Sequence, residues 1–142
     1  MFSKSESKKL REDFWISFGK SYPTKWILYN TKIKDFSFKF YFDTSKAMVA
    51  LDIESKDLEK RINLWEKVIS LKSVLIADYL PEAHFEEYTF LENQTEISRI
   101  YVRLDQVSIH NKNTWQQTMI FMNEHMIKFE AFFNDFEAVF ID

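Results

Sequence analysis

The sequence contains no cysteine, one glycine and two prolines among its 142 residues. Without cysteine the chain can form no disulfide, no thiolate zinc site, no iron–sulfur cluster and no cysteine nucleophile. Loops that cradle phosphates, and the sharp turns that carry nucleophilic serines, need several glycines, because a side chain would block the backbone there. The single glycine therefore excludes the P-loop, the dinucleotide-binding motif and the serine-hydrolase elbow.

Long hydrophobic runs and a large charge of one sign are also missing. No window approaches the ~18 apolar residues of a membrane-spanning helix, and residues 1–11 lack the apolar core of a signal peptide. The formal net charge is −3, too small to indicate a nucleic-acid or membrane binder by itself. We therefore expect a cytoplasmic protein without membrane association. Residues 1–34 nevertheless hold eight basic and three acidic side chains, a local charge of +5.

Apolar and aromatic residues are abundant instead. Hydrophobic residues make up 46% of the chain and aromatic residues 18%, with 15 phenylalanines. This is enough apolar surface to offset the conformational entropy lost on folding. The length fits one ordinary domain, so we expect a single domain over 1–142.

Hydrophobic spacing in the first 31 residues predicts a helix and a strand. Apolar residues recur every four positions up to Tyr22-Pro23, which predicts a first helix capped by Ser3 or Ser5. Residues 26–31 form a short aromatic and β-branched run, which predicts a strand.

Strict alternation over 36–42 and 47–53 predicts a hairpin closed by a turn at 43–46. Pairing Phe42 with Ala47 places every large apolar side chain of both strands on one face.

The second half predicts two long helices and another hairpin. Residues 55–79 carry two apolar stripes behind a Ser55 cap, so this helix should be covered on two sides. A seam of Trp, Met and Phe over 115–140 predicts a final helix of ~39 Å, part of which should project beyond the sheet. Strands at 84–92 and 97–105 would pair Glu87 with Arg103 and point these residues inward: Tyr88, Phe90, Ile100, Val102 and Leu104.

These elements predict an α+β fold with the order αβββαββα. We expect a mostly antiparallel, five-stranded sheet. The second and third helices should cover its Phe-rich face, and the first helix should pack at an edge or on the other face.

Three segments of the chain form a recognisable set: AMVALDIES (47–55), RINLWEKVISLKSVL (61–75) and ISRIYVRLDQVSIHNKNTW (97–115), which leads into the Phe-rich helix. They resemble the uncharacterised prokaryotic domain-of-unknown-function family 4268 over essentially the whole chain. The resemblance implies a compact α+β domain and assigns no activity, substrate or catalytic residue. Some family members follow a restriction-endonuclease-type nuclease domain, which implies a nucleic-acid or defence context.

The sharpest enzymatic hypothesis is a minimal Mg²⁺-dependent nuclease. Asp43 ends one predicted strand, and Glu54-Ser55-Lys56 ends the next, which resembles the D…(D/E)-x-K pattern of such enzymes. Asp43 and Glu54 would hold the ion, and Lys56 would position the attacking water. The alternative interpretation is structural, because Asp favours turns and a serine between polar residues is typical of a helix cap.

A second hypothesis is a nucleic-acid-binding face on the outer side of the sheet, because cations bind phosphates and aromatic rings stack on bases. Its candidate residues are Lys39, Tyr41, Arg99, Tyr101 and Arg103. Acidic residues on the same face, among them Asp52 and Glu54, favour a solvated and self-paired surface instead.

The three histidines have no metal-ligand spacing, so no metal site and no cofactor is predicted, except Mg²⁺ under the nuclease hypothesis. The function we expect is a non-catalytic accessory or interaction domain with a nucleic-acid or protein partner. The alternatives are the nuclease and a structural homodimer formed through the Met/Phe seam.

Overall fold

The computed structural model describes residues 2–141, which fold into an α+β structure. The four strands form one antiparallel sheet in the order β1-β2-β4-β3. The elements are α1 (Lys4–Ser21), β1 (Phe36–Phe42), β2 (Lys46–Ile53), α2 (Leu58–Ser70), α3 (Lys72–Asp78), β3 (His84–Phe90), β4 (Glu96–Asp105), the short 3₁₀ helix η1 (Lys112–Thr114) and α4 (Trp115–Ile141).

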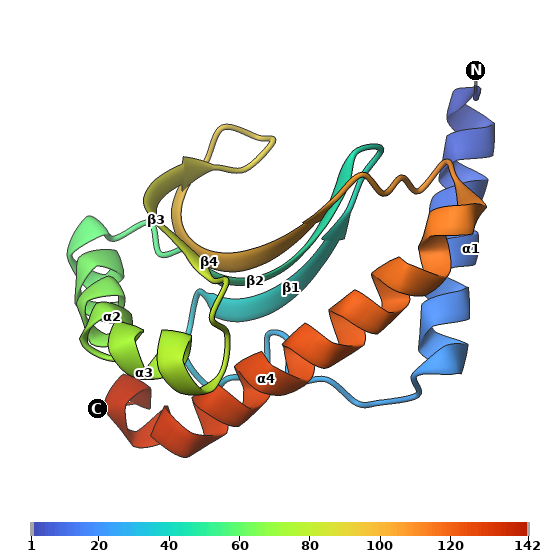
Figure 1. Cartoon of the computed structure of the whole chain (residues 1–142). Helices are drawn as coiled ribbons and strands as arrows, with labels where there is room; N and C mark the ends of the chain where they lie inside the picture. The colour runs from blue at the N-terminus through green and yellow to red at the C-terminus, as the bar shows by residue number, and fades with distance from the viewer. Residues whose placement is uncertain (1, 142) are drawn as a thin grey trace.

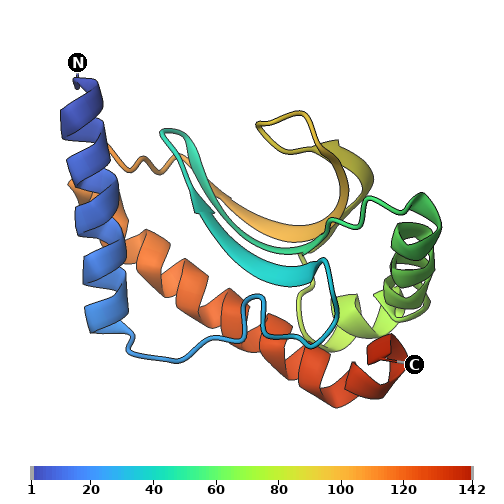
Figure 2. The same cartoon turned by 180° about the vertical axis from the view of Figure 1, so that it is seen from behind.

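The sheet is strongly curved, and the helices surround only its convex side. Figure 1 shows α4 running beneath the convex side, α1 at one end of the sheet, and α2 with α3 at the other end. The opposite side, called the concave face below, carries no helix in either view (Figures 1 and 2). No helix within residues 2–141 is both long and apolar enough to cross a membrane.

The main core lies between the convex side of the sheet and α4. Phe38 packs against Phe129 with ring centroids 5.7 Å apart, and Phe36 packs against Phe140 at 5.3 Å. The predicted projection of the last helix is wrong, because α4 leaves helical geometry at Phe136 and its last turn folds back. Phe140 is consequently only 2% exposed.

The alternating pattern of the first hairpin is confirmed residue for residue. Phe42 lies opposite Ala47, and Phe36 lies opposite Ile53, as the apolar alternation requires. The turn between the strands is the one expected at 43–46, and the Asp43 N–H donates to the Lys46 carbonyl across it.

The predicted strand at 26–31 does not exist, so the sheet has four strands instead of five. Its aromatic residue packs from a loop, with the Trp26 ring 5.8 Å from that of Phe40. Thr31 supports the loop, since its buried hydroxyl donates to the Phe36 carbonyl at 2.6 Å. Trp26 does pack against the core, but it does so from a loop and not from a strand.

The predicted register of the second hairpin is also wrong. Phe90 lies opposite Glu96, and an irregularity between Glu86 and Thr89 shifts the pairing. Tyr88 and Phe90, predicted to point inward, are more than half exposed. A β-bulge inserts an unpaired residue and reverses the faces that follow it, which alternation alone cannot show.

The helix predicted over 55–79 is two helices, α2 and α3, separated at Leu71. Its cap is Asp57 instead of Ser55, because the Asp57 carboxylate accepts the N–H groups of Glu59 and Lys60. Only one side is covered, and Leu58 is more than half exposed. The cap of α1 was predicted correctly, since Ser3 forms a capping box with Glu6.

Candidate functional site

The concave face collects the five residues of the proposed nucleic-acid-binding set. Side chains alternate along a strand and line up across paired strands, so the register fixes which residues share this face. Lys39 lies opposite Ala50, which lies opposite Tyr101. In one neighbouring row, Tyr41 lies opposite Met48, which lies opposite Arg103. In the other neighbouring row, Asp52 lies opposite Arg99.

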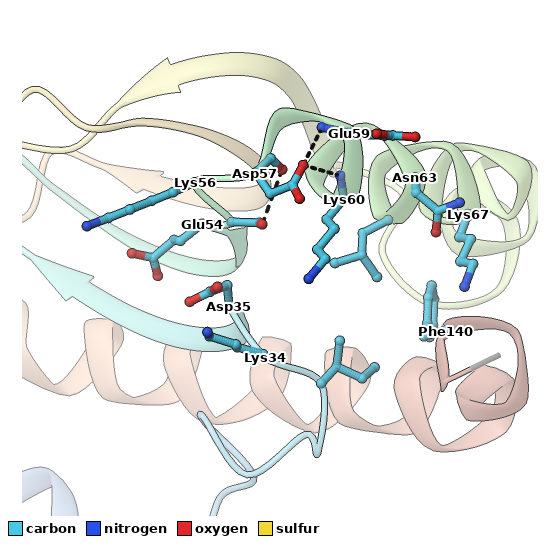
Figure 3. Close-up of a pocket in the computed structure, with 13 residues that line it drawn as sticks. Lys34, Asp35, Glu54, Lys56, Asp57, Glu59, Lys60, Asn63, Lys67 and Phe140 are labelled. Atoms are coloured by element: carbon cyan, nitrogen blue, oxygen red, sulfur yellow. Dashed lines mark hydrogen bonds between the residues drawn. The ribbon is translucent and has the colours of Figure 1, made fainter.

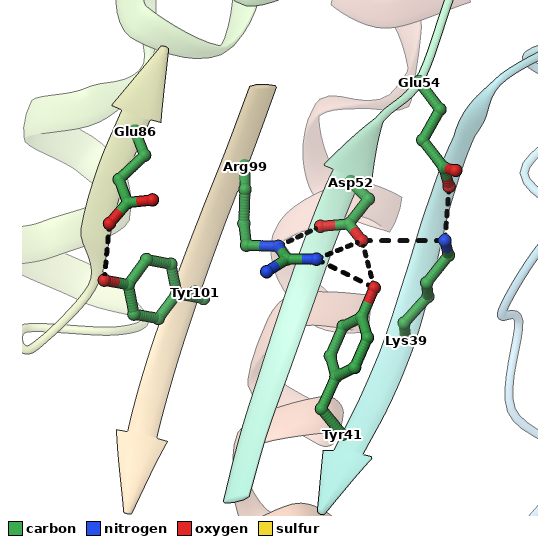
Figure 4. A network of polar contacts seen from close by, with 7 residues as sticks. All are labelled: Lys39, Tyr41, Asp52, Glu54, Glu86, Arg99 and Tyr101. Atoms are coloured by element: carbon green, nitrogen blue, oxygen red, sulfur yellow. Dashed lines mark hydrogen bonds and ion pairs between the residues drawn. The ribbon is translucent and has the colours of Figure 1, made fainter. Parts of the chain in front are cut away.

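Asp52 is the centre of a polar network on the concave face (Figure 4). Arg99 donates to the Asp52 carboxylate through Nε at 2.7 Å and Nη2 at 3.0 Å. The Tyr41 hydroxyl donates to the same carboxylate at 2.5 Å, and it accepts a bond from Arg99 Nη2 at 2.9 Å. At the edge, Lys39 Nζ lies 2.5 Å from the Glu54 carboxylate and 3.7 Å from that of Asp52.

The network is buried although no helix covers it. Asp52 is 0% exposed and Arg99 is 8% exposed, because neighbouring side chains crowd together on the inside of the curve. The Arg99 guanidinium also lies over the Tyr41 ring, 4.6 Å from its centroid.

Burial and the neighbouring charges fix the protonation states of this network. Burial raises the pKa of the Tyr41 phenol, and the charge and hydrogen bond of Asp52 raise it further. Burial alone would lower the pKa of Arg99, but the bonds to Asp52 raise it above the ordinary value. Tyr41 therefore stays a neutral donor and Arg99 a cation at physiological pH.

This arrangement is poorly suited to proton transfer or nucleophilic attack. General acid–base catalysis needs a group whose pKa lies near the operating pH, whereas the pKa values of Tyr41 and Arg99 are shifted away from it. The Asp52 carboxylate already accepts three hydrogen bonds from these two neighbours. These bonds hold the side chains of Asp52, Arg99 and Tyr41 in fixed positions relative to one another.

The rest of the concave face is a small apolar patch with an aromatic stack. Met48, Ala50 and Tyr101 form a buried cluster on this side of the sheet. The His84 ring stacks on Tyr101 at 5.1 Å, and the Tyr101 hydroxyl donates to Glu86 at 2.9 Å.

The structure does not bring the three proposed nuclease residues together. Asp43 lies at the closed end of the β1–β2 hairpin and Glu54 follows its open end, which separates them by roughly 20 to 25 Å at ~3.3 Å per residue. Glu54 pairs with Lys39 instead. No group of three or more metal-ligating side chains that could hold an ion occurs within residues 2–141.

Asp43 organises the hairpin turn. Its carboxylate accepts the N–H groups of Ser45 and Lys46 at 2.8 and 2.9 Å, and the Lys46 ammonium group at 3.1 Å. Burial would raise the pKa of Asp43, but these bonds outweigh it and lower the pKa below the ordinary value.

The lowered pKa of Asp43 leads to a pH prediction. A folded-state pKa below the unfolded value means that Asp43 stabilises the fold at neutral pH, and that this contribution is lost as pH falls through the folded pKa. We expect an NMR titration of the Asp43 carboxyl carbon to give a midpoint below ~3.9. Lys46→Met should raise the midpoint, whereas a wild-type midpoint at or above ~3.9 would contradict this role.

A cavity of about 900 Å³ lies at the other end of the β1–β2 hairpin, between α2, residues 33–35 and Phe140 (Figure 3). Figure 3 shows Glu54 and Lys56 at one end of it, and Lys60 and Lys67 along α2. Its lining holds four lysines and four acidic residues, so it favours neither anions nor cations: Lys34, Lys56, Lys60, Lys67, Asp35, Glu54, Asp57 and Glu59.

The specific ionic contacts of two buried arginines were not foreseen from the sequence. One is the bidentate pair of Asp52 and Arg99, and the other joins Arg61, which is 4% exposed, to the carbonyl and carboxylate of Glu96. A lone acid inside the apolar run 47–53 was the available signal for Asp52. Identifying its partner required knowledge that β2 and β4 are neighbours.

Comparison with protein families gives a match. The family model described as Domain of unknown function (DUF4268) matches residues 10–137. No curated protein and no solved structure matches the chain.

Proposed function

The chain belongs to the family described as Domain of unknown function (DUF4268), and we propose that it is a non-catalytic interaction domain that holds a protein partner on its concave face. One observation carries this proposal. Asp52 and Arg99 are buried and bond to each other and to the partly buried Tyr41, yet this network lies on the side of the sheet that no helix covers.

Stability alone is a weak reason for such a network. Burying an ion pair carries a desolvation penalty that its attraction often only offsets, and apolar residues of similar volume frequently give an equally stable protein. A rigid polar surface is useful for recognition, however, because groups already held in place lose little conformational entropy when a partner binds.

A protein partner suits the charges of this face better than a polyanion does. Each cation near the network already has an acidic neighbour: Lys39 pairs with Glu54, Arg99 with Asp52, and Arg103 with Asp105. Nucleic-acid binding depends on cations that are available to phosphates. The Tyr41 and Tyr101 rings are also covered by Arg99 and His84, which leaves less ring surface for bases.

Nucleic acid remains the second candidate, because the five residues predicted for it share this one face. A gel-shift with labelled single- and double-stranded DNA and RNA separates the two possibilities. The protein-partner proposal predicts no salt-sensitive retention at roughly 50 or 200 mM salt. Retention that falls with salt would establish nucleic-acid binding instead, and cleavage that requires Mg²⁺ and stops with chelator would establish a nuclease.

A photo-crosslinking amino acid at position 103 tests the protein partner directly. The Arg103 side chain is 40% exposed beside the buried network, so substitution there should leave the fold intact. We expect a discrete crosslinked protein in cells from position 103, and none from position 124 on the exposed side of α4. Asp105→Arg should reduce the crosslink at least tenfold. A band of twice the chain mass would indicate a homodimer, and equal crosslinking from both positions would contradict the proposal.

A further inference from the structure

The strand β1 forms one edge of the sheet, and part of its outer side is open. The Glu54 N–H donates to the Asp35 carbonyl, and the Asp43 N–H donates to that of Lys46, which fixes the alternation of the ladder. The backbone groups of Phe36, Phe38, Phe40 and Phe42 therefore point away from β2.

The preceding loop covers only the first half of this edge. The Phe38 N–H donates to the Leu28 carbonyl at 3.0 Å, and the Phe36 carbonyl accepts the Thr31 hydroxyl. Beyond Phe38, the outward N–H and carbonyl of Phe40 form no hydrogen bond within residues 2–141. Figure 2 shows this strand on the viewer's side of the sheet, with the loop running below it.

An apolar groove adjoins the open part of the edge. It has a volume of about 400 Å³ and is lined by residues of α1, the loop and β1, among them Trp15, Leu28, Tyr29 and Phe40. Tyr29 forms its rim and is 77% exposed. The groove can accept an apolar side chain next to the unpaired backbone.

Natural proteins usually protect such edges, since unpaired strands attract other strands. The opposite edge, β3, carries an irregularity between Glu86 and Thr89 and two consecutive acidic residues. The seven residues of β1 pair without irregularity and contain one charge, Lys39. The described β1 lacks the irregularity and the acidic pair of β3, and Lys39 is its single charged residue.

We propose that the open edge of β1 at residues 40–42, beyond the point where Leu28 pairs with Phe38, binds an extended peptide segment of a protein partner as an added strand. The unpaired backbone of Phe40 can form hydrogen bonds with the main chain of an extended peptide. The groove can bind an apolar side chain of the same peptide. This site lies along the edge of the sheet and adjoins the concave face at Lys39, which also lines the groove. It goes beyond the function proposed above.

A second copy of this chain fits the edge less well than a flexible segment. Pairing two β1 strands about Phe40 would place Phe42 of one copy opposite Phe38 of the other. Leu28 already occupies that position, because its carbonyl accepts the Phe38 N–H. The opening therefore admits a short segment that can turn away at Leu28.

A library of random heptapeptides displayed on phage, selected against the whole chain, tests this proposal. We expect enriched peptides with apolar residues at alternate positions, and amide shift changes on binding that centre on Phe40–Phe42. N-methylation of the peptide N–H groups that face β1 should weaken binding at least tenfold, because each lost hydrogen bond contributes to the affinity.

Two matched variants locate the site. Tyr29→Asp should weaken peptide binding about tenfold, since it puts a charge at the rim of the groove. Tyr88→Asp changes an exposed tyrosine on the opposite edge strand and should leave binding unchanged. Failure to enrich any peptide, shift changes centred elsewhere, or equal effects of the two variants would overturn the proposal. Asp105→Arg should not affect peptide binding, so this result is independent of the concave-face test.

Discussion

Replacement of Asp52 by alanine is expected to lower the free energy of unfolding by about 3 to 5 kcal/mol, because it leaves the buried Arg99 guanidinium without its carboxylate. Asp52 is 0% exposed and accepts both bonds of the Arg99 fork. Urea denaturation followed by circular dichroism measures the loss, with the denaturant slope showing whether unfolding remains two-state.

The double variant Asp52→Leu/Arg99→Met distinguishes an unpaired charge from a general defect in packing. Removing both charges together should restore most of the stability lost in Asp52→Ala, since apolar residues can replace a buried ion pair. A loss below about 1 kcal/mol in Asp52→Ala would show that water reaches Arg99 and that the network is less buried than the structure indicates.

Phe14→Ala is expected to destabilise the protein by about 3 to 5 kcal/mol, the usual range for a fully buried phenylalanine. The Phe14 ring is 0% exposed and contacts Phe42 at 4.6 Å and Trp115 at 5.3 Å between centroids. It thereby joins α1 to both the sheet and the start of α4. Thermal and urea unfolding of the purified variant measure the effect.

The control for this prediction lies two residues further along the same helix. Ile16 is 57% exposed, so Ile16→Ala should change stability by less than about 0.5 kcal/mol. If both variants lost equally little, α1 would not be docked on the sheet in solution. If both lost equally much, the effect would come from helix formation instead of packing.

Sequence patterns predicted the parts of this fold that depend on local periodicity. The β1–β2 register followed from alternation alone, because only one pairing puts all the large apolar side chains on one face. The register of β3 and β4 failed at the irregularity after Glu86, which has no periodic signal. The prediction of a strand at 26–31 failed for another reason. Trp26 packs against the core from an irregular segment, so its burial does not require a strand.

The candidate site was predictable as a set of residues but not as a network. Parity along the strands is sufficient to place Lys39, Tyr41 and Arg99 on one face. Their partners depend on the neighbour relation between β2 and β4, which are separated by two helices and a strand in the chain. The residues of the nuclease hypothesis do not come together, because Asp43 and Glu54 lie at opposite ends of one hairpin.

The position of α4 at the end of the described chain also affects how the protein folds during its synthesis. All four strands precede α4 in the chain, but their Phe-rich side is covered by residues 115–141. At a translation rate of ~5 to 20 residues per second, this helix takes roughly one to five seconds to be made. During that interval the Phe-rich side of the strands is not yet covered by α4. The incomplete chain is therefore most prone to aggregation in the interval before α4 can pack against the sheet.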